Sequence, residues 1–277
     1  MSQAAAKAGE QSAIGWRRWL PDAAALGVLA LVIGAFFAPI LFQGRYMPEG
    51  GGDLAGFLYP LYNYTVDSLR AGRIPLWNPF LYSGSPFLAD IQTAVFYPLT
   101  LLQALLPGAV EYRRLELLSV FHFWLAGALM YALLRVWFRP ALSRWAALLG
   151  AVAFGLSDLF FTHFGNLNLI ASAAWLPLIL LGARLGGGPG ILIGATALAL
   201  SALAGHTQPV LHSLLALALY GVFALAVAAW AAWRKRGAEG LVDWGLPDAP
   251  TTPGQSARLT LVTLLGITAL GLGLAAL

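Results

Sequence analysis

Long apolar runs, separated by short polar stretches, make up most of this 277-residue chain. Each of seven runs is close to the roughly 20 residues that a helix needs to cross a bilayer. A shorter apolar piece at 93–107 is interrupted by Pro98, which predicts an interfacial or re-entrant segment and not a span. We therefore expect an all-α, polytopic membrane bundle of about seven helices. The predicted spans are 23–42, 115–134, 141–160, 167–184, 189–205, 208–233 and 259–277.

Basic residues orient this bundle, because short cytoplasmic loops collect Lys and Arg. If 93–107 does not cross, eleven of the 16 Lys and Arg residues lie inside. If it does cross, the basic loop at 135–144 and the cluster at 234–236 are forced outside, against that rule. The non-crossing arrangement predicts a cytoplasmic tail at 1–22, a membrane module at 23–277, a long first external loop at 43–114 and a Pro- and Gly-rich cytoplasmic linker at 234–258.

Composition agrees with a membrane protein and excludes other classes. Charged residues make up 10% of the chain, against about a quarter in soluble domains. The sequence has no cysteine, so disulfides and thiolate sites are excluded. The net charge of +4 does not indicate nucleic-acid binding, because the basic residues flank apolar runs and form no stripe with aromatic residues. The last run stops at Leu277 without a polar flank, so we expect the sequence to be the amino-terminal part of a longer protein.

Acidic residues supply the first candidates for chemistry. Asp53 follows three glycines just after the first predicted span. A carboxylate there can coordinate a divalent cation or accept a proton from a substrate hydroxyl. Alternatively, it caps the amphipathic helix that follows. Asp90 precedes an apolar segment, where it either caps a helix or adds a second carboxylate to the site.

The stretch GRIPLWNP is predicted to be stiff without being helical, because its two prolines restrict the backbone. Trp77 and Asn78 either anchor the loop at the membrane interface or form one wall of a sugar site, the indole by stacking and the amide by hydrogen bonding. Arg73 is the preferred candidate for pairing with a phosphate, ahead of Arg113 and Arg114.

Two polar turns are expected on the same face as the external loop. The turn SDLFFTHFGNLN carries His163 and Asn166, and the turn AGHTQP carries His206 and Gln208. Polar groups at the mouths of membrane helices usually face a cavity or a functional site. A lone buried histidine is more often structural, but convergence of both turns on the loop of Asp53 makes a shared site an equal alternative.

Most of residues 50–210 resemble the bacterial YfhO-like membrane protein family, within the C-type glycosyltransferase (GT-C) superfamily. The resemblance lies in PLWNP followed by the G-x-P-x-x-A-x-x-Q pattern of GSPFLADIQ, and in HFGNLNLIASAAWLPLILL and LALSALAGHTQP. The sequence departs from the family pattern at Thr207, where proline is expected, and at LSDLFF, where a small serine- and glycine-containing form is expected.

The resemblance implies a multi-pass enzyme of the bacterial plasma membrane with a cytoplasmic amino terminus. Such an enzyme moves a sugar from a polyprenyl-phosphate carrier to an envelope polymer or lipid acceptor at the outer face. It also implies that Asp53 is catalytic, either as a general base or through a bound Mg²⁺ or Mn²⁺. Asp90 is then a second catalytic candidate. The predicted substrate-binding residues are Arg73, Trp77, Asn78, Gln92, His163, Asn166, His206 and Gln208.

Two other functions remain open at this stage, a transporter or flippase and a noncatalytic assembly subunit. A transporter is expected to carry polar residues near the bilayer midplane. The central parts of the predicted spans are almost purely Ala, Leu, Gly and Val, which counts against a polar translocation path.

Overall fold

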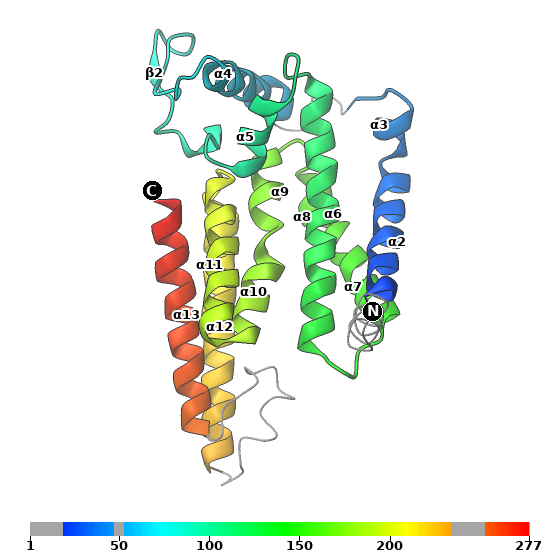
Figure 1. Ribbon diagram of the computed structural model, residues 1–277, viewed down its shortest axis with the longest axis vertical. Helices are drawn as coiled ribbons and strands as arrows, with labels where there is room; N and C mark the ends of the chain where they lie inside the picture. Colours follow the sequence, from blue (N-terminus) through cyan, green and yellow to red (C-terminus); the bar gives the residue numbers. More distant parts are fainter. Residues whose placement is uncertain (1–18, 47–52, 234–252, 277) are drawn as a thin grey trace, which may run out of the picture.

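The computed structural model describes residues 19–46, 53–233 and 253–276. It is a bundle of upright helices with a layer of short helices and a small hairpin across one end, here called the cap (Figure 1). In chain order the elements are α2 (Leu20–Phe36), α3 (Ala38–Phe42), η1 (Leu54–Leu58), α4 (Tyr59–Arg70), β1 (Trp77–Asn78), β2 (Ser85–Pro86), η2 (Ile91–Thr93), α5 (Pro98–Leu105), α6 (Tyr112–Trp137), α7 (Arg144–Gly155), α8 (Asp158–Thr162), α9 (Leu167–Ala173), α10 (Leu176–Leu185), α11 (Gly187–Leu203), α12 (Thr207–Trp233) and α13 (Pro253–Ala275).

Five helical stretches of the described residues are long and apolar enough to cross a membrane. The apolar helices α2 and α11 have 17 residues each, or about 26 Å, slightly less than the roughly 30 Å of a hydrocarbon core. The prediction of an all-α membrane bundle is therefore confirmed, while the count of seven spans stays a prediction. The five stretches are Tyr112–Trp137, Arg144–Thr162, Leu167–Leu185, Thr207–Trp233 and Gln255–Ala275.

Several predicted spans are divided into two consecutive helices. Pro39 stands in the first turn of α3 and Pro177 in the first turn of α10. A proline has no backbone N–H to donate, so it is tolerated in a first turn but ends the helix before it. The last predicted span also begins earlier than its apolar run, because α13 starts at Pro253. Most of the linker predicted at 234–258 lies outside the described residues.

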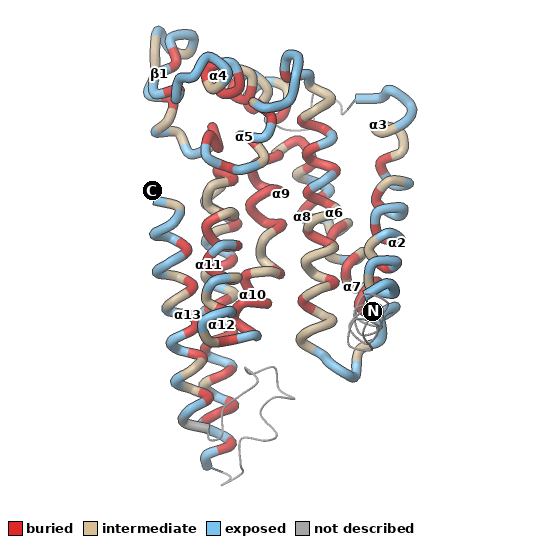
Figure 2. The backbone as a smooth tube through the Cα atoms, in the orientation of Figure 1, coloured by how far each residue is buried: buried red, intermediate tan, exposed pale blue. Residues whose placement is uncertain are grey.

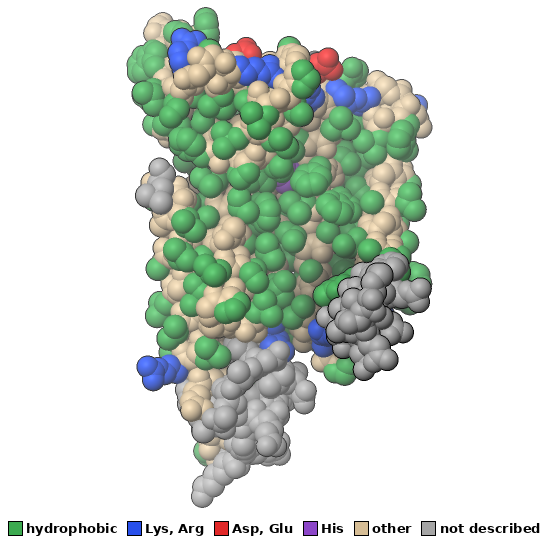
Figure 3. Space-filling model, viewed as in Figure 1, with side chains coloured by type: hydrophobic (Ala, Val, Ile, Leu, Met, Phe, Trp, Pro, Cys, Tyr) green, Lys and Arg blue, Asp and Glu red, His purple; other side chains and the backbone are tan. Residues whose placement is uncertain are grey.

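The surface of the bundle is that of a protein surrounded by lipid. Figure 3 shows hydrophobic side chains over most of the visible flank, with charged side chains gathered at the two ends. Leu31, Leu149 and Leu219 are each at least 70% exposed. Buried residues follow the inward sides of the helices (Figure 2). This distribution places the apolar flank in the bilayer and the charged ends in the headgroup regions.

Small residues let the helices approach closely. A Cβ atom added at Gly182 of α10 would lie 2.5 Å from the Gly194 backbone nitrogen of α11. One added at Gly155 of α7 would lie 2.9 Å from the Phe123 carbonyl oxygen of α6. Close backbone contact is a main source of helix association in lipid, where water drives no apolar burial between helices.

The cap is a folded layer and does not cross the bundle. The eight residues of α5 extend only about 12 Å, too short for a span. Arg70, at the end of α4, donates from Nε to the Ala104 carbonyl (3.1 Å) and from Nη2 to the Gln103 and Leu106 carbonyls. These carbonyls have no partner within α5, so Arg70 satisfies the end of that helix and joins it to α4.

The alternation of the helices brings two connections to the cap end. Starting from α2, which rises toward the cap, α6 descends and α7 returns (Figure 1). The connection from α8 to α9 and the turn before α12 therefore lie beneath the cap, and the loop between α6 and α7 lies at the opposite end. Which end faces the outside of the cell stays a prediction.

Candidate functional site

The turn before α12, the start of α9 and the segment around η2 meet beneath the cap. Gly205 has a φ of +86°, and a Cβ atom there would collide with the Ile91 carbonyl oxygen. Asn168 of α9 donates from Nδ2 to the Gln92 carbonyl oxygen at 2.5 Å. The Oδ1 atom of Asn168 accepts from the hydroxyl of Tyr62 of α4 at 3.4 Å. The two polar turns singled out in the sequence are thus joined to the first loop.

Asp53 lies at the start of η1 and is exposed to solvent. Its carboxylate does not cap η1. Instead, Asn166 Nδ2 donates to Asp53 Oδ2 at 3.2 Å, while Asn166 Oδ1 accepts from the Leu169 backbone N–H at 3.3 Å and caps α9. Within the described residues, Asp53 Oδ1 accepts no hydrogen bond. One carboxylate oxygen is thus positioned by the bundle, and the other is available to a ligand.

His206 lies within electrostatic reach of Asp53, and His163 lies within reach of His206. Burial lowers the pKa of His206, the nearby His163 lowers that pKa further, and the Asp53 carboxylate raises it. His206 Nδ1 is buried and has no hydrogen-bond partner in the described part of the chain. The Nδ1 atom of His163 lies 2.8 Å from the Leu159 carbonyl oxygen, so Nδ1 is assigned as the donor. The pKa of His206 is thus lowered overall, which favours the neutral imidazole beside the Asp53 carboxylate.

A small cavity of about 70 Å³ adjoins His163 between α8, α9, α10 and α12. Gln208 and His212 also line it, together with apolar residues that include Leu159 and Pro209. A cavity of this size holds a few water molecules and no sugar ring. Gln208 and His163 thus share one cavity. A sugar would have to approach Asp53 from the solvent-exposed side.

Asp90 and Gln92 are near the site but use their polar atoms locally. Asp90 Oδ1 accepts from the Gln92 backbone N–H at 3.0 Å and caps η2. Gln92 contacts Asn168 through its backbone carbonyl and not through its side chain. Of the two alternatives for Asp90, the structure shows the capping role, and a catalytic role stays a prediction.

The predicted sugar wall lies apart from Asp53. Asp53 precedes η1 and α4, whereas Trp77 and Asn78 form β1 of the hairpin at the far end of α4 (Figure 1). Asn78 is buried, and its Oδ1 accepts from the Phe80 backbone N–H at 2.9 Å in a local turn. The structure therefore does not place these residues beside Asp53. Substrate binding by them stays a prediction without support from their position.

The stiffness of this segment comes from the hairpin. Trp77 pairs with Pro86 across the two strands, and its ring lies over Gly84, where a Cβ atom would be 2.7 Å from the ring. The hydroxyl of Tyr64 donates to the Trp77 carbonyl at 2.6 Å. Arg73 is exposed, and its side chain makes no hydrogen bond within the described residues. It is free to pair with a phosphate, but at a distance from Asp53.

The described residues give no support to the predicted Mg²⁺ or Mn²⁺. They contain no group of three or more His, Asp or Glu side chains placed to hold a metal ion. Asp53 supplies a single carboxylate, whereas such cations prefer several oxygen ligands. Metal binding by Asp53 stays a prediction, and no chemical step below depends on it.

Buried tyrosines beneath the cap are the residues that sequence reasoning missed. Tyr97 lies just before α5, and its hydroxyl is 2.9 Å from His122 Nε2 and accepts from Trp175 Nε1 at 3.2 Å. Burial raises the pKa of Tyr97 and raises that of Tyr62 to about 12, so both phenols stay protonated. The polar character of the external segment gave no signal that these rings would be buried.

No family model matches the sequence, and neither a curated protein nor a solved structure matches it. The class that fold and site define is an all-α membrane protein with a polar site beneath a cap at one end of the bundle. Membership in the YfhO-like family stays a prediction from the sequence motifs.

Proposed function

We propose that the protein is a GT-C-type glycosyltransferase that moves a sugar from a polyprenyl-phosphate-linked donor to a cell-envelope acceptor. The observation that carries the proposal is the exposure of Asp53 and its contacts with neighbouring side chains. An exposed carboxylate stands at the headgroup end of the bundle, fixed by Asn166 and accompanied by the His206 imidazole. A group held in this way at the depth of a lipid-linked phosphate is suited to proton transfer.

In the proposed reaction, Asp53 acts as the general base. Its free Oδ1 accepts the proton of the acceptor hydroxyl while the hydroxyl oxygen forms a bond to the anomeric carbon of the sugar. The bond between that carbon and the phosphate oxygen breaks, and the electron pair leaves with the lipid phosphate. Asn166 keeps Oδ2 engaged, so the carboxylate presents one oxygen to the acceptor.

Replacing Asp53 with Asn tests this role. The amide retains the size of the carboxylate but cannot accept the proton, so we expect sugar transfer to fall by about 100-fold or more. Transfer from labelled polyprenyl-phosphate sugars is measured in membranes that contain the full chain. Asp67→Asn is the matched control, because Asp67 is exposed on α4 and its side chain makes no hydrogen bond within the described residues.

The outcomes separate a catalytic role from a noncatalytic one. Loss of transfer in Asp53→Asn, with normal membrane insertion and an active Asp67→Asn control, supports the general base. An unchanged transfer rate in Asp53→Asn rejects the catalytic role and favours the noncatalytic subunit.

A further inference from the structure

A second polar cluster lies at the end of the bundle opposite the cap, far from Asp53. A cavity of about 770 Å³ opens there between α2 and α6. Its polar part contains Asp22, Tyr131 and three arginines, Arg135, Arg139 and Arg144. Its apolar part is lined by small or aliphatic side chains that include Ala23, Leu26, Ala128 and Ala132. The cavity thus has a charged mouth and an apolar wall.

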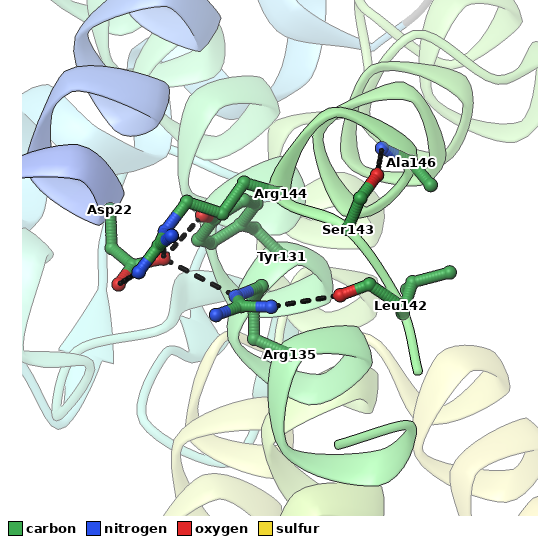
Figure 4. Close-up of polar contacts among 7 residues, drawn as sticks. All are labelled: Asp22, Tyr131, Arg135, Leu142, Ser143, Arg144 and Ala146. Atoms are coloured by element: carbon green, nitrogen blue, oxygen red, sulfur yellow. Dashed lines mark hydrogen bonds and ion pairs between the residues drawn. The ribbon is translucent and has the colours of Figure 1, made fainter. Parts of the chain in front are cut away.

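Asp22 is the centre of the polar part (Figure 4). Its Oδ1 accepts from the Tyr131 hydroxyl at 2.6 Å, from Arg135 Nε at 3.3 Å and from Arg144 Nε at 3.0 Å. Arg144 Nη2 also contacts Asp22 Oδ2 at 3.5 Å. The second anchor of Arg135 is the Leu142 carbonyl, 2.9 Å from Nη1. A single carboxylate from α2 therefore fixes two guanidinium groups from α6 and α7.

The charges of this cluster do not balance. Asp22 is its one acidic residue, whereas three arginines line the cavity, and arginine stays charged in proteins. Within the described residues, neither Arg135 Nη2 nor Arg144 Nη1 has a hydrogen-bond partner, and the Arg139 guanidinium makes no hydrogen bond at all. The mouth of the cavity therefore carries excess positive charge with unused donors, the arrangement that binds phosphate oxygens.

The apolar wall distinguishes between sources of phosphate. Ala132 and Ala128 lie about one and two turns from Arg135 on α6, and Ala23 and Leu26 of α2 line the same cavity. Deeper in the bundle the two helices are joined, because Trp124 Nε1 donates to the Leu26 carbonyl at 3.4 Å. A free phosphate ion would leave this apolar wall unoccupied, whereas a phospholipid fills it with its acyl chains.

We propose that this cavity binds an anionic phospholipid from the bilayer leaflet at this end, with its phosphate at the three arginines and its acyl chains along α2 and α6. Basic cavities between membrane helices bind anionic headgroups in this manner. The distribution of Lys and Arg predicts that the leaflet is the cytoplasmic one. The proposal does not depend on the glycosyltransferase function.

Arg139→Gln tests the site while leaving every hydrogen bond of Asp22 in place. Purified, delipidated full-length protein is titrated with dioleoyl phosphatidylglycerol, with dioleoyl phosphatidylcholine and with inorganic phosphate, and bound ligand is counted by native mass spectrometry. We expect the wild type to bind the anionic lipid at least about tenfold more tightly than the zwitterionic one. Arg139→Gln should reduce anionic binding by about tenfold and leave phosphatidylcholine binding unchanged.

Arg258→Gln is the matched control, because it removes the same charge from an exposed position at the start of α13, outside the cavity. Ala132→Phe fills the apolar part and is expected to weaken lipid binding without removing charge. Equal affinities for the two lipids, or equal losses in Arg139→Gln and Arg258→Gln, would overturn the proposal. Displacement of the lipid by inorganic phosphate at stoichiometric concentration would also overturn the proposal.

Discussion

Asn166 performs two tasks with one amide group. Its Nδ2 donates to Asp53 Oδ2 and its Oδ1 caps α9 by accepting from the Leu169 backbone N–H. Among short side chains, an amide offers both a donor and an acceptor, whereas an aspartate offers only acceptors when ionised. The position of the Asp53 carboxylate therefore depends on the start of α9, and the site and the bundle are coupled through this residue.

Gly205 lies where the turn before α12, the start of α9 and the segment around η2 meet, so a side chain at this position would disturb their packing. In Gly205→Ala, the new Cβ meets the Ile91 carbonyl at a positive φ, so we expect a loss in free energy of unfolding of about 2–4 kcal/mol. Gly72→Ala is the control, because Gly72 has a φ of +71° with nothing within 4 Å of the added atom. Denaturant unfolding in detergent measures both variants. Equal losses of unfolding free energy in the two variants would show that backbone strain at the positive φ alone, and not packing against Ile91, accounts for the effect.

At the scale of elements, the cap is joined to the bundle by hydrogen bonds that cross between layers. The Tyr97 hydroxyl joins the start of α5 to α6 through His122 and to Trp175 before α10. The His122 side chain is fully buried, and its Nδ1 lies 2.7 Å from the Leu118 carbonyl oxygen. The contact between Tyr97 and His122 therefore holds the cap to the bundle through two buried polar side chains.

Tyr97→Phe should loosen this connection. The variant leaves His122 Nε2 and Trp175 Nε1 without their partner, which costs about 1–3 kcal/mol of unfolding free energy. The substitution should also accelerate amide hydrogen exchange more in α5 than in α13. Tyr82→Phe is a suitable comparison, because Tyr82 is 92% exposed. Loss of its hydroxyl should change neither the free energy of unfolding nor the exchange rate in α5. A Tyr97→Phe protein with unchanged stability and unchanged exchange in α5 would contradict a structural role for the hydroxyl.

At the scale of the whole molecule, hydropathy predicted an all-α membrane bundle, because each apolar run must satisfy its backbone hydrogen bonds internally, but it did not predict where prolines divide the runs into two helices. The shared face of the two polar turns also followed from their alternation along the chain. The hairpin at β1 and β2 could not be predicted, since strands of two residues show no period. The Asp22 cluster was missed because it forms only where α2, α6 and α7 meet.

The direction of the bundle decides whether the Asp53 site faces the cell envelope, and the absence of cysteine makes it directly measurable. Ala89→Cys in the cap and Ala141→Cys in the loop between α6 and α7 place thiols at exposed alanines of opposite ends. Because the topology predicted from the sequence assigns eleven of the 16 Lys and Arg residues to the side opposite the cap, we expect the cap end to face outward. A membrane-impermeant maleimide should label Ala89→Cys in intact cells and Ala141→Cys only after permeabilisation. The reverse pattern would put Asp53 in the cytoplasm and exclude transfer to an outer acceptor, whereas the lipid cavity would remain but draw from the other leaflet.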